Sequence, residues 1–229
     1  MAEANGDIAG PIAESLDEFT DTTITPGMTF DAHADAMLHG TNGFRVIGDG
    51  SGSNAYGYKT FSEKTSLYAR CYFQVDEMTI NQYSLGFVLA LWDGATALIQ
   101  FGFRRAAAGA GNPDKWRCVG QDLTSTNGDI GAFDTPHYVD MYWTAGTGDN
   151  GGAVVWVDGN ETPIMNELNN NLTAYAADTV RGGMYNLTMP NGNYIYVDDI
   201  IVNTTGPIGA YSDSITDWTT HEHTTLTFS

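Results

Sequence analysis

Aromatic and polar side chains occupy every second position of one strand-like segment, at Tyr68, Arg70, Tyr72 and Gln74. Successive side chains of a β-strand point to opposite faces, so these four would share a face and the apolar residues between them would pack inward. Aromatic rings stack on the apolar faces of sugars, while guanidinium and amide groups bind hydroxyls. The segment therefore predicts a sugar-binding face, although such residues are also common on exposed sheet positions that bind nothing.

A second strand-like segment, Ala97–Arg105, shows the same alternation. Ile99, Phe101 and Phe103 take one side, and Gln100 and Arg104 take the other. If both segments contribute to one concave sheet face, Gln100 and Arg104 complete the ligand site that begins at Tyr68, and the ligand would be a glycan.

The charge balance limits the class of partner. Nine basic residues face 28 acidic residues, for a formal net charge of −19. Such a chain repels nucleic-acid phosphates and anionic membranes, and the balance also works against a polyanionic substrate. Neutral ligands, basic partners and hard cations such as calcium remain.

Many short strands are predicted, because runs rich in Val, Ile, Tyr, Phe and Trp alternate with Gly-containing turns and no long helical period occurs. Pro11 to Phe19 is the best candidate for a short helix, and neither a signal peptide nor a membrane span is visible. The predicted strands are Gly43–Ile47, Ser66–Asp76, Tyr83–Asp93, Ala97–Arg105, Lys115–Val119, His137–Ala145, Ala153–Asp158, Thr179–Leu187 and Tyr194–Asn203.

The two cysteines, Cys71 and Cys118, each lie in an apolar strand-like segment. Two buried free thiols and one disulfide are equally compatible with this placement, so the cysteines do not fix the redox compartment.

Three segments together resemble the laminin G-like branch of the concanavalin A-like lectin/glucanase superfamily. They are the long strand Thr65–Asp76, the pair His137–Trp143 and Gly152–Gly159, and the late strand Tyr194–Val202 with its Val-Asp-Asp-Ile sequence. The resemblance spans roughly residues 28–206 and implies a single antiparallel β-sandwich of the jelly-roll type. That fold hosts lectins, glucanases, lyases and structural modules, so the resemblance does not fix the function.

The resemblance also implies a metal site. Asp198 matches an aspartate that binds calcium in laminarinase-like members of the superfamily, where backbone carbonyls from early in the chain complete the coordination. A structural calcium ion at Asp198 is therefore expected, with a turn-capping or solvent-facing aspartate as the alternative.

The catalytic residues of the superfamily's enzymes are not matched. The Glu-x-Asp-x-x-Glu motif of its glucanases is absent, as are the signature segments of alginate lyases. Arg70, Tyr72, Gln100 and His137 are residue types that a lyase needs, but they follow no such signature.

The sequence thus predicts one all-β domain at residues 16–206, an N-terminal arm or early edge strand at 1–15 and a C-terminal tail or arm at 207–229. The favoured function is a non-catalytic exterior module of a cell surface, fibre or virion, with glycans or neighbouring subunits, including copies of itself, as partners. The alternative is a secreted polysaccharide-active enzyme, either a lyase or a glycoside hydrolase, of the same fold.

Overall fold

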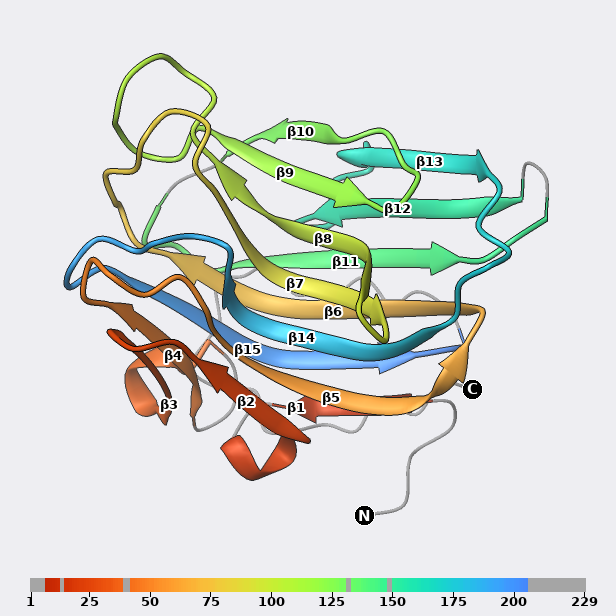
Figure 1. Ribbon diagram of the computed structural model, residues 1–229, viewed down its shortest axis with the longest axis horizontal. Helices are drawn as coiled ribbons and strands as arrows, with labels where there is room; N and C mark the ends of the chain where they lie inside the picture. The colour runs from red at the N-terminus through yellow and green to blue at the C-terminus, as the bar shows by residue number, and fades with distance from the viewer. Residues whose placement is uncertain (1–6, 13–14, 39–41, 131–132, 148–149, 206–229) are drawn as a thin grey trace.

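The computed structural model of the 229-residue chain describes residues 7–12, 15–38, 42–130, 133–147 and 150–205. Two antiparallel β-sheets lie face to face and form a sandwich, which confirms the predicted all-β jelly-roll architecture (Figure 1). The predicted tail at 207–229 lies outside the described residues.

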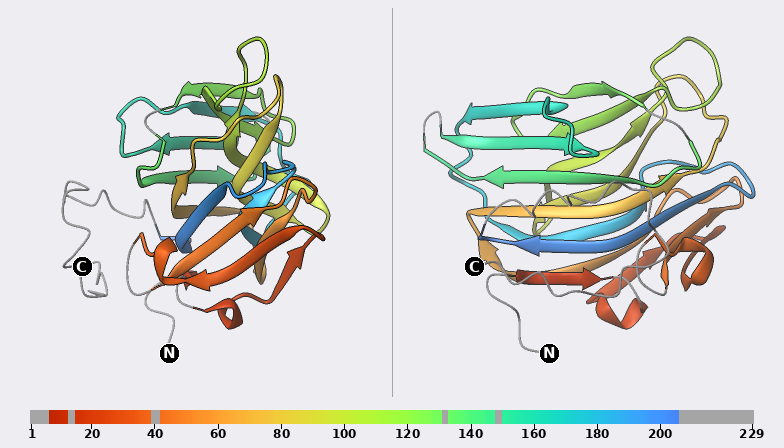
Figure 2. Two further views of the ribbon diagram at one scale, coloured as in Figure 1. Left: turned by 90° about the vertical axis from the view of Figure 1, so that its left-hand side faces the viewer. Right: turned by 180° about the vertical axis from the view of Figure 1, so that it is seen from behind.

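The first sheet, seen from the front in the right-hand view of Figure 2, has the strand order β13-β12-β11-β6-β15-β4-β3, and β1 pairs with the last part of β15. Its strands are β1 (Asp7–Ile12), β3 (Met28–His33), β4 (Gly43–Gly48), β6 (Ser66–Val75), β11 (His137–Thr144), β12 (Gly151–Val157), β13 (Met165–Asn170) and β15 (Tyr194–Asn203).

The second sheet faces the viewer in Figure 1 and has the strand order β10-β9-β8-β7-β14-β5-β2. Its strands are β2 (Asp21–Ile24), β5 (Ala55–Lys64), β7 (Leu85–Asp93), β8 (Thr96–Arg104), β9 (Lys115–Gly120), β10 (Thr126–Asp129) and β14 (Ala177–Tyr185).

The core lies between the two sheets and follows the alternation of the strands. In β6 the apolar residues from Leu67 to Val75 all face the core, and in β8 Ile99, Phe101 and Phe103 do the same. Leu98 is also buried in the core, although strict alternation predicts the opposite side for it. The outer face of each sheet is therefore set by the remaining residues, and each outer face is a candidate surface for function.

All nine predicted strands are present, with ends that differ by no more than two residues. The predicted short helix at Pro11 to Phe19 is wrong in type and extent. Ile12 ends β1, and among the described residues of this segment only Leu16–Glu18 is helical, as a single 3-10 turn capped by Ser15. A second 3-10 turn occupies Ala34–Ala36. No helix within the described residues has the length and hydropathy needed to cross a lipid bilayer.

Cys71 and Cys118 are free thiols that are buried in the core, on β6 and β9 respectively. Burial raises the pKa of Cys118 to about 12, and it also raises the pKa of Cys71 well above the usual value. The thiolate is the reactive form, so it is scarce on both residues at neutral and mildly alkaline pH.

We expect Ellman's reagent at pH 8 to react with neither thiol in the native protein and with both after unfolding in guanidinium chloride. The measurement is the absorbance of the released thionitrobenzoate with and without denaturant. A full burst before denaturant is added would show that the thiols are accessible and would contradict this packing.

Candidate functional site

The residues of the predicted ligand site lie on two different sheets. Tyr68, Arg70, Tyr72 and Gln74 are on the outer face of the first sheet, because they belong to β6. Gln100 and Arg104 belong to β8 and lie on the outer face of the second sheet. The expectation that they complete one face is therefore corrected: the hydrophobic core separates the two groups, since β6 and β8 pack inward against each other's sheet.

On the outer face of the first sheet, the central side chains make contacts within the protein. Arg70 is only 1 % exposed, and its Nε and Nη2 each donate to a carboxylate oxygen of Asp140 at 2.6 Å. Its guanidinium lies 4.7 Å from the centre of the Tyr138 ring, and Tyr72 and Tyr138 form a small buried cluster with Leu38. Sugar binding by the β6 residues stays a prediction, but Arg70 and Tyr72 are buried.

His137 is not part of a catalytic group with Gln100. Its ring packs against Phe73 and Trp116, and Nδ1 lies 2.7 Å from a carboxylate oxygen of Asp158. The four lyase-type residues considered from the sequence are thus divided between the two sheets.

Asp198, the predicted calcium ligand, is fully buried on β15. Its carboxylate accepts hydrogen bonds from the backbone N–H groups of Leu38 at 2.9 Å and Asp199 at 2.8 Å. It thereby ties the segment before β4 to the last strand. Among the described residues no three His, Cys, Asp or Glu side chains are close enough together to hold a metal ion. The described contacts therefore fit a hydrogen-bond acceptor, and calcium binding stays a prediction.

We expect Asp198→Asn to lower the free energy of unfolding by about 1–3 kcal/mol, because the amide cannot accept at both oxygens and a buried donor loses its partner. Denaturant unfolding measures this. The same melts with calcium and with a chelator test the metal: calcium bound by the folded chain would raise the midpoint. Equal stability of the variant and the native chain would show that the Asp198 hydrogen bonds do not hold this segment.

The outer face of the second sheet is cationic and aromatic. It carries Arg104 on β8, Arg117 on β9 and Arg181 on β14, and none of them has a carboxylate partner among the described residues. The other three arginines of the chain each form an ion pair with an aspartate: Arg45 with Asp31, Arg70 with Asp140 and Arg105 with Asp114. Burial and the nearby charge of Arg104 lower the pKa of Arg117. Two cations held close together in this way favour an anion between them.

Five buried nitrogen donors on this face have no hydrogen-bond partner among the residues that the structure describes. They are Trp92 Nε1, Gln100 Nε2, Arg104 Nε, Arg117 Nε and Arg181 Nε. Buried donors are nearly always paired in proteins, by ordered water or a ligand where the protein offers no acceptor, so five on one face make it a candidate ligand surface. Because all five are donors, the ligand they fit is rich in oxygen acceptors.

Small residues form the floor of this face between the functional side chains. Ala90 on β7 pairs with Gln100 on one side and with Arg181 on the other, so the residues with the amide and the guanidinium lie on the two strands that flank this small residue. On β8 the neighbour of Gln100 on this face is Gly102. A Cβ added there would lie 1.9 Å from the carbonyl oxygen of Gly86, so the close approach of β7 to β8 requires glycine.

Aromatic side chains surround Arg181. Its guanidinium lies 3.6 Å from the centre of the Trp92 ring, and its Nη1 donates to Tyr56 Oη at 3.2 Å. The ring of Tyr185 contacts the rings of Tyr56, Phe87 and Trp92 at centroid distances of 6.0, 5.8 and 5.9 Å respectively. A small pocket of about 10 Å³ is lined by Tyr56, Phe87, Ala90, Arg181 and Tyr185 among others.

A β-bulge shapes the strand that carries Arg181 and Tyr185. The pairing of β14 with β7 shifts by one residue between Gly182 and Tyr185. Gly183 has a φ of +129°, in the range that favours glycine, and a Cβ there would lie 2.5 Å from the carbonyl oxygen of Ala55. Bulges of this kind re-aim side chains and are frequent next to active sites. The glycines in Arg181-Gly-Gly-Met-Tyr185 are thus explained by the bulge, which sets the directions of the Arg181 and Tyr185 side chains on the outer face.

Sequence reasoning found Gln100 and Arg104 but missed Tyr56, Trp92, Arg117, Arg181 and Tyr185. A usable signal was present: Arg117 and Arg181 each occupy the polar side of a predicted strand. What the sequence did not show is that β5, β14, β7, β8 and β9 are neighbours.

Carboxylates are absent from the middle of this face. The strands β5, β14, β7, β8 and β9 carry three acidic residues, Glu63, Asp93 and Asp178, and each lies at a strand end or next to one. Glycoside hydrolysis by the usual pair of carboxylates therefore has no support on this face.

The fold places the chain among the concanavalin A-like jelly-roll sandwiches. The alginate lyase Aly36B is similar, with a TM-score of 0.60, 12% identity and coverage of 87% of this chain and 96% of that one. So is an endo-β-1,4-glucuronan lyase from the fungus Trichoderma reesei, with a TM-score of 0.57, 12% identity and coverage of 84% and 94%. A carbohydrate esterase of the Shiga toxin-encoding bacteriophage phi24B has a TM-score of 0.55, 17% identity and coverage of 87% and 97%. No family model and no curated protein sequence matches the chain.

These comparisons correct the prediction of a non-catalytic exterior module. The solved structures that share the fold are mostly polysaccharide lyases and other carbohydrate-active proteins, which favours the alternative of a polysaccharide-active enzyme. At such low identity they establish the fold, and the activity has to be argued from the site.

Proposed function

We propose that the chain is a polysaccharide lyase that cleaves uronate-containing polysaccharides on the outer face of its second sheet. The observation that carries the proposal is the convergence of five unpaired N–H donors, three of them on arginines without an acidic partner among the described residues. Uronate carboxylates and sugar hydroxyls supply the acceptors that such donors require.

The overall charge of −19 does not oppose this substrate at the site itself. A polyanion interacts most strongly with the charges nearest to it, because screening shortens the reach of more distant ones to about 8–10 Å. The acidic residues of the other arginine pairs are neutralised locally, whereas Arg104, Arg117 and Arg181 present unpaired positive charge on one face. The acidic composition led to the expectation that a polyanion is disfavoured. In this proposal the positive charge near the site, rather than the net charge of the chain, governs binding of the polyanion.

The chemistry is a β-elimination. A base removes the proton on C5 of a uronate, the electron pair forms the C4=C5 double bond, and the bond from C4 to the linking oxygen breaks as that oxygen takes a proton. The carboxylate next to C5 must be neutralised so that negative charge can develop beside it. Gln100 and Arg181, on either side of Ala90, are placed to bind that carboxylate.

Tyrosine supplies the proton transfers in this proposal. Tyr185 and Tyr56 flank Arg181 on the same face, with their rings 6.0 Å apart and nearly perpendicular. A positioned side chain that moves a proton contributes typically about 10²–10⁴-fold to a rate. Arg104 and Arg117 bind the carboxylate of a neighbouring uronate along the polymer.

The test is the release of unsaturated product. The native chain is incubated with alginate, polyglucuronate, polygalacturonate and hyaluronan, and the ultraviolet absorbance of the C4=C5 double bond is followed. Arg181→Lys keeps the charge but loses the forked donor geometry, so we expect at least a tenfold loss of kcat/KM. Reducing ends without the absorbance would replace the lyase with a hydrolase, and no product from a wide polyuronate panel would refute the proposal.

Several finer predictions accompany this proposal. A polysaccharide substrate lies outside cells, so we place the chain outside the cell that makes it, and glycans are its partners. Membership of the laminin G-like branch, a particle-surface location and self-association also remain predictions.

A further inference from the structure

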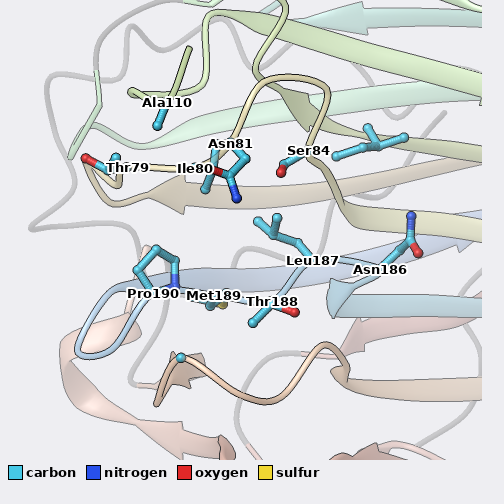
Figure 3. Close-up of a pocket in the computed structure, with 12 residues that line it drawn as sticks. Thr79, Ile80, Asn81, Ser84, Ala110, Asn186, Leu187, Thr188, Met189 and Pro190 are labelled. Carbon is cyan, nitrogen blue, oxygen red and sulfur yellow. The ribbon is translucent and has the colours of Figure 1, made fainter.

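A cavity of about 450 Å³ opens at the end of the sandwich, where three loops and Gly50 of the β4–β5 connection meet. The loops are the β6–β7 connection around Thr79 to Ser84, the β8–β9 connection near Ala110 and the β14–β15 connection from Asn186 to Pro190 (Figure 3). Its volume falls within the range of about 300–1,000 Å³ that small-molecule sites occupy in proteins.

The cavity adjoins the proposed active site. Asn186 directly follows Tyr185, and Leu85 on the rim is the register partner of Arg104. The guanidinium of Arg104 also lies 5.7 Å from the ring of Tyr83, in the loop that forms the cavity wall. Leu85 lies five residues from Ala90 along β7, roughly 16 Å at about 3.3 Å per residue. A polysaccharide bound over Ala90 therefore reaches this cavity with a unit further along the polymer.

Hydrogen bonds between the loops hold the walls in place. Ile80 and Gly111 exchange two backbone hydrogen bonds of 2.9 Å, and Gly50 N–H donates to the carbonyl of Met189 at 3.0 Å. The side chain of Asn112 donates to Glu77 at 2.6 Å. The pocket is thus largely preformed, which reduces the entropic cost of binding.

The lining has no charged side chain. Its polar side chains are hydroxyls and amides, and within the described part of the chain no hydrogen bond satisfies them. They are Thr79, Asn81, Ser84, Asn186 and Thr188. Ile80, Leu187 and Met189 are buried and supply apolar surface in the same cavity.

Hydroxyl and amide groups around an apolar floor fit a neutral sugar ring, whereas a uronate carboxylate would lose its hydration here without gaining a cation. From this contrast with the adjacent arginine face we infer that the cavity is a subsite for a neutral sugar unit. The substrate, on the proposed lyase function, is then a heteropolysaccharide in which a neutral unit occurs a few positions along the polymer from the uronate that is cleaved.

The test compares two polymers on one protein. The first is β-1,4-linked polyglucuronate, in which every unit is charged, and the second is hyaluronan or deacylated gellan, in which glucuronate stands beside neutral units. We expect kcat/KM to be at least about tenfold higher for one of the mixed polymers, the gain that two hydrogen bonds of about 0.7 kcal/mol each would supply.

The variant Asn81→Ala/Ser84→Ala removes two of the polar groups. We expect it to raise KM for the mixed polymer about tenfold and to leave polyglucuronate cleavage unchanged. Asn186 is left intact because its backbone φ is +69°, a conformation that alanine adopts less readily, so its replacement could change the shape of the cavity wall. Asn166→Ala, an exposed amide on the first sheet, is the control and should match the native chain on both polymers.

Calorimetric binding of oligosaccharides from both polymers to Tyr185→Phe separates the two proposals. The comparison is between Tyr185→Phe alone and Tyr185→Phe combined with Asn81→Ala/Ser84→Ala. Equal affinity of these two proteins for the mixed oligosaccharide would overturn the neutral subsite, even if the protein is an active lyase. Preferential binding of that oligosaccharide without any unsaturated product from the native chain would retain the subsite and refute the lyase.

Discussion

Replacement of Tyr185 by phenylalanine is expected to lower kcat on a cleaved polyuronate by about 10²–10⁴-fold, because a phenol that moves a proton in the transition state is lost. The ring remains, so its contacts with Tyr56, Phe87 and Trp92 persist and the fold should be unaffected. KM should change much less than kcat, since the hydroxyl acts mainly in the transition state. Initial rates of double-bond formation measure both.

Tyr142→Phe is the matched control for that variant. Tyr142 lies on the outer face of the first sheet, where the centre of its ring is 4.7 Å from that of the tilted Tyr68 ring. Loss of the Tyr142 hydroxyl should leave the rate unchanged. If Tyr142→Phe lowered kcat as much as Tyr185→Phe, the active site would belong to the first sheet. A fully active Tyr185→Phe together with an inactive Tyr56→Phe would move the proton transfer to Tyr56.

The Arg70–Asp140 ion pair governs the second large effect, which is on stability. We expect Arg70→Ala to lower the free energy of unfolding by about 3 kcal/mol, the lower end of the cost of breaking a buried pair, because Asp140 keeps a partly buried charge without its partner. Out of a total stability of about 5–15 kcal/mol this is a large fraction. Urea unfolding of native and variant protein gives the difference directly.

A double variant separates the ion pair from the packing. Arg70→Met/Asp140→Leu removes both charges and keeps apolar volume, so it should recover most of the stability that Arg70→Ala loses. Lyase activity, measured at a temperature where all variants are folded, should be equal in the native chain and in this double variant. A loss of activity in the stable double variant would give the first sheet a role in binding substrate.

Local sequence pattern was sufficient for nine of the fifteen described strands, and β3 and β5 were among those it missed. The alternation in Leu67–Asp76 and Ala97–Arg105 identified the core residues of β6 and β8, because a period of two is a property of a single strand. The polar strands β2, β10 and β13 were missed, since residues such as Thr22, Asn127 and Glu167 give no apolar alternation. Their pairing partners hold them in the sheets.

The candidate site could not be assembled in the same way. Gln100 and Arg181 are 81 positions apart in the sequence, and their proximity depends on both β8 and β14 pairing with β7. Strand order is a property of the whole sandwich. No local pattern therefore shows that Arg70 and Arg104 lie on different sheets. The positive φ of Gly183 and the bulge beside it arise from the same tertiary pairing.

The placement of Arg104, Arg117 and Arg181 on one outer face has a consequence for how the molecule moves toward a polymer. A chain with a net charge of −19 and its unpaired cations gathered on one side has a large dipole moment. In the field of a polyanion such a molecule rotates until the arginine side leads, while its remaining surface is repelled. Encounter would then be oriented at low ionic strength and random at high ionic strength. After cleavage, the same repulsion would discourage the enzyme from adhering to its polymer through any other side.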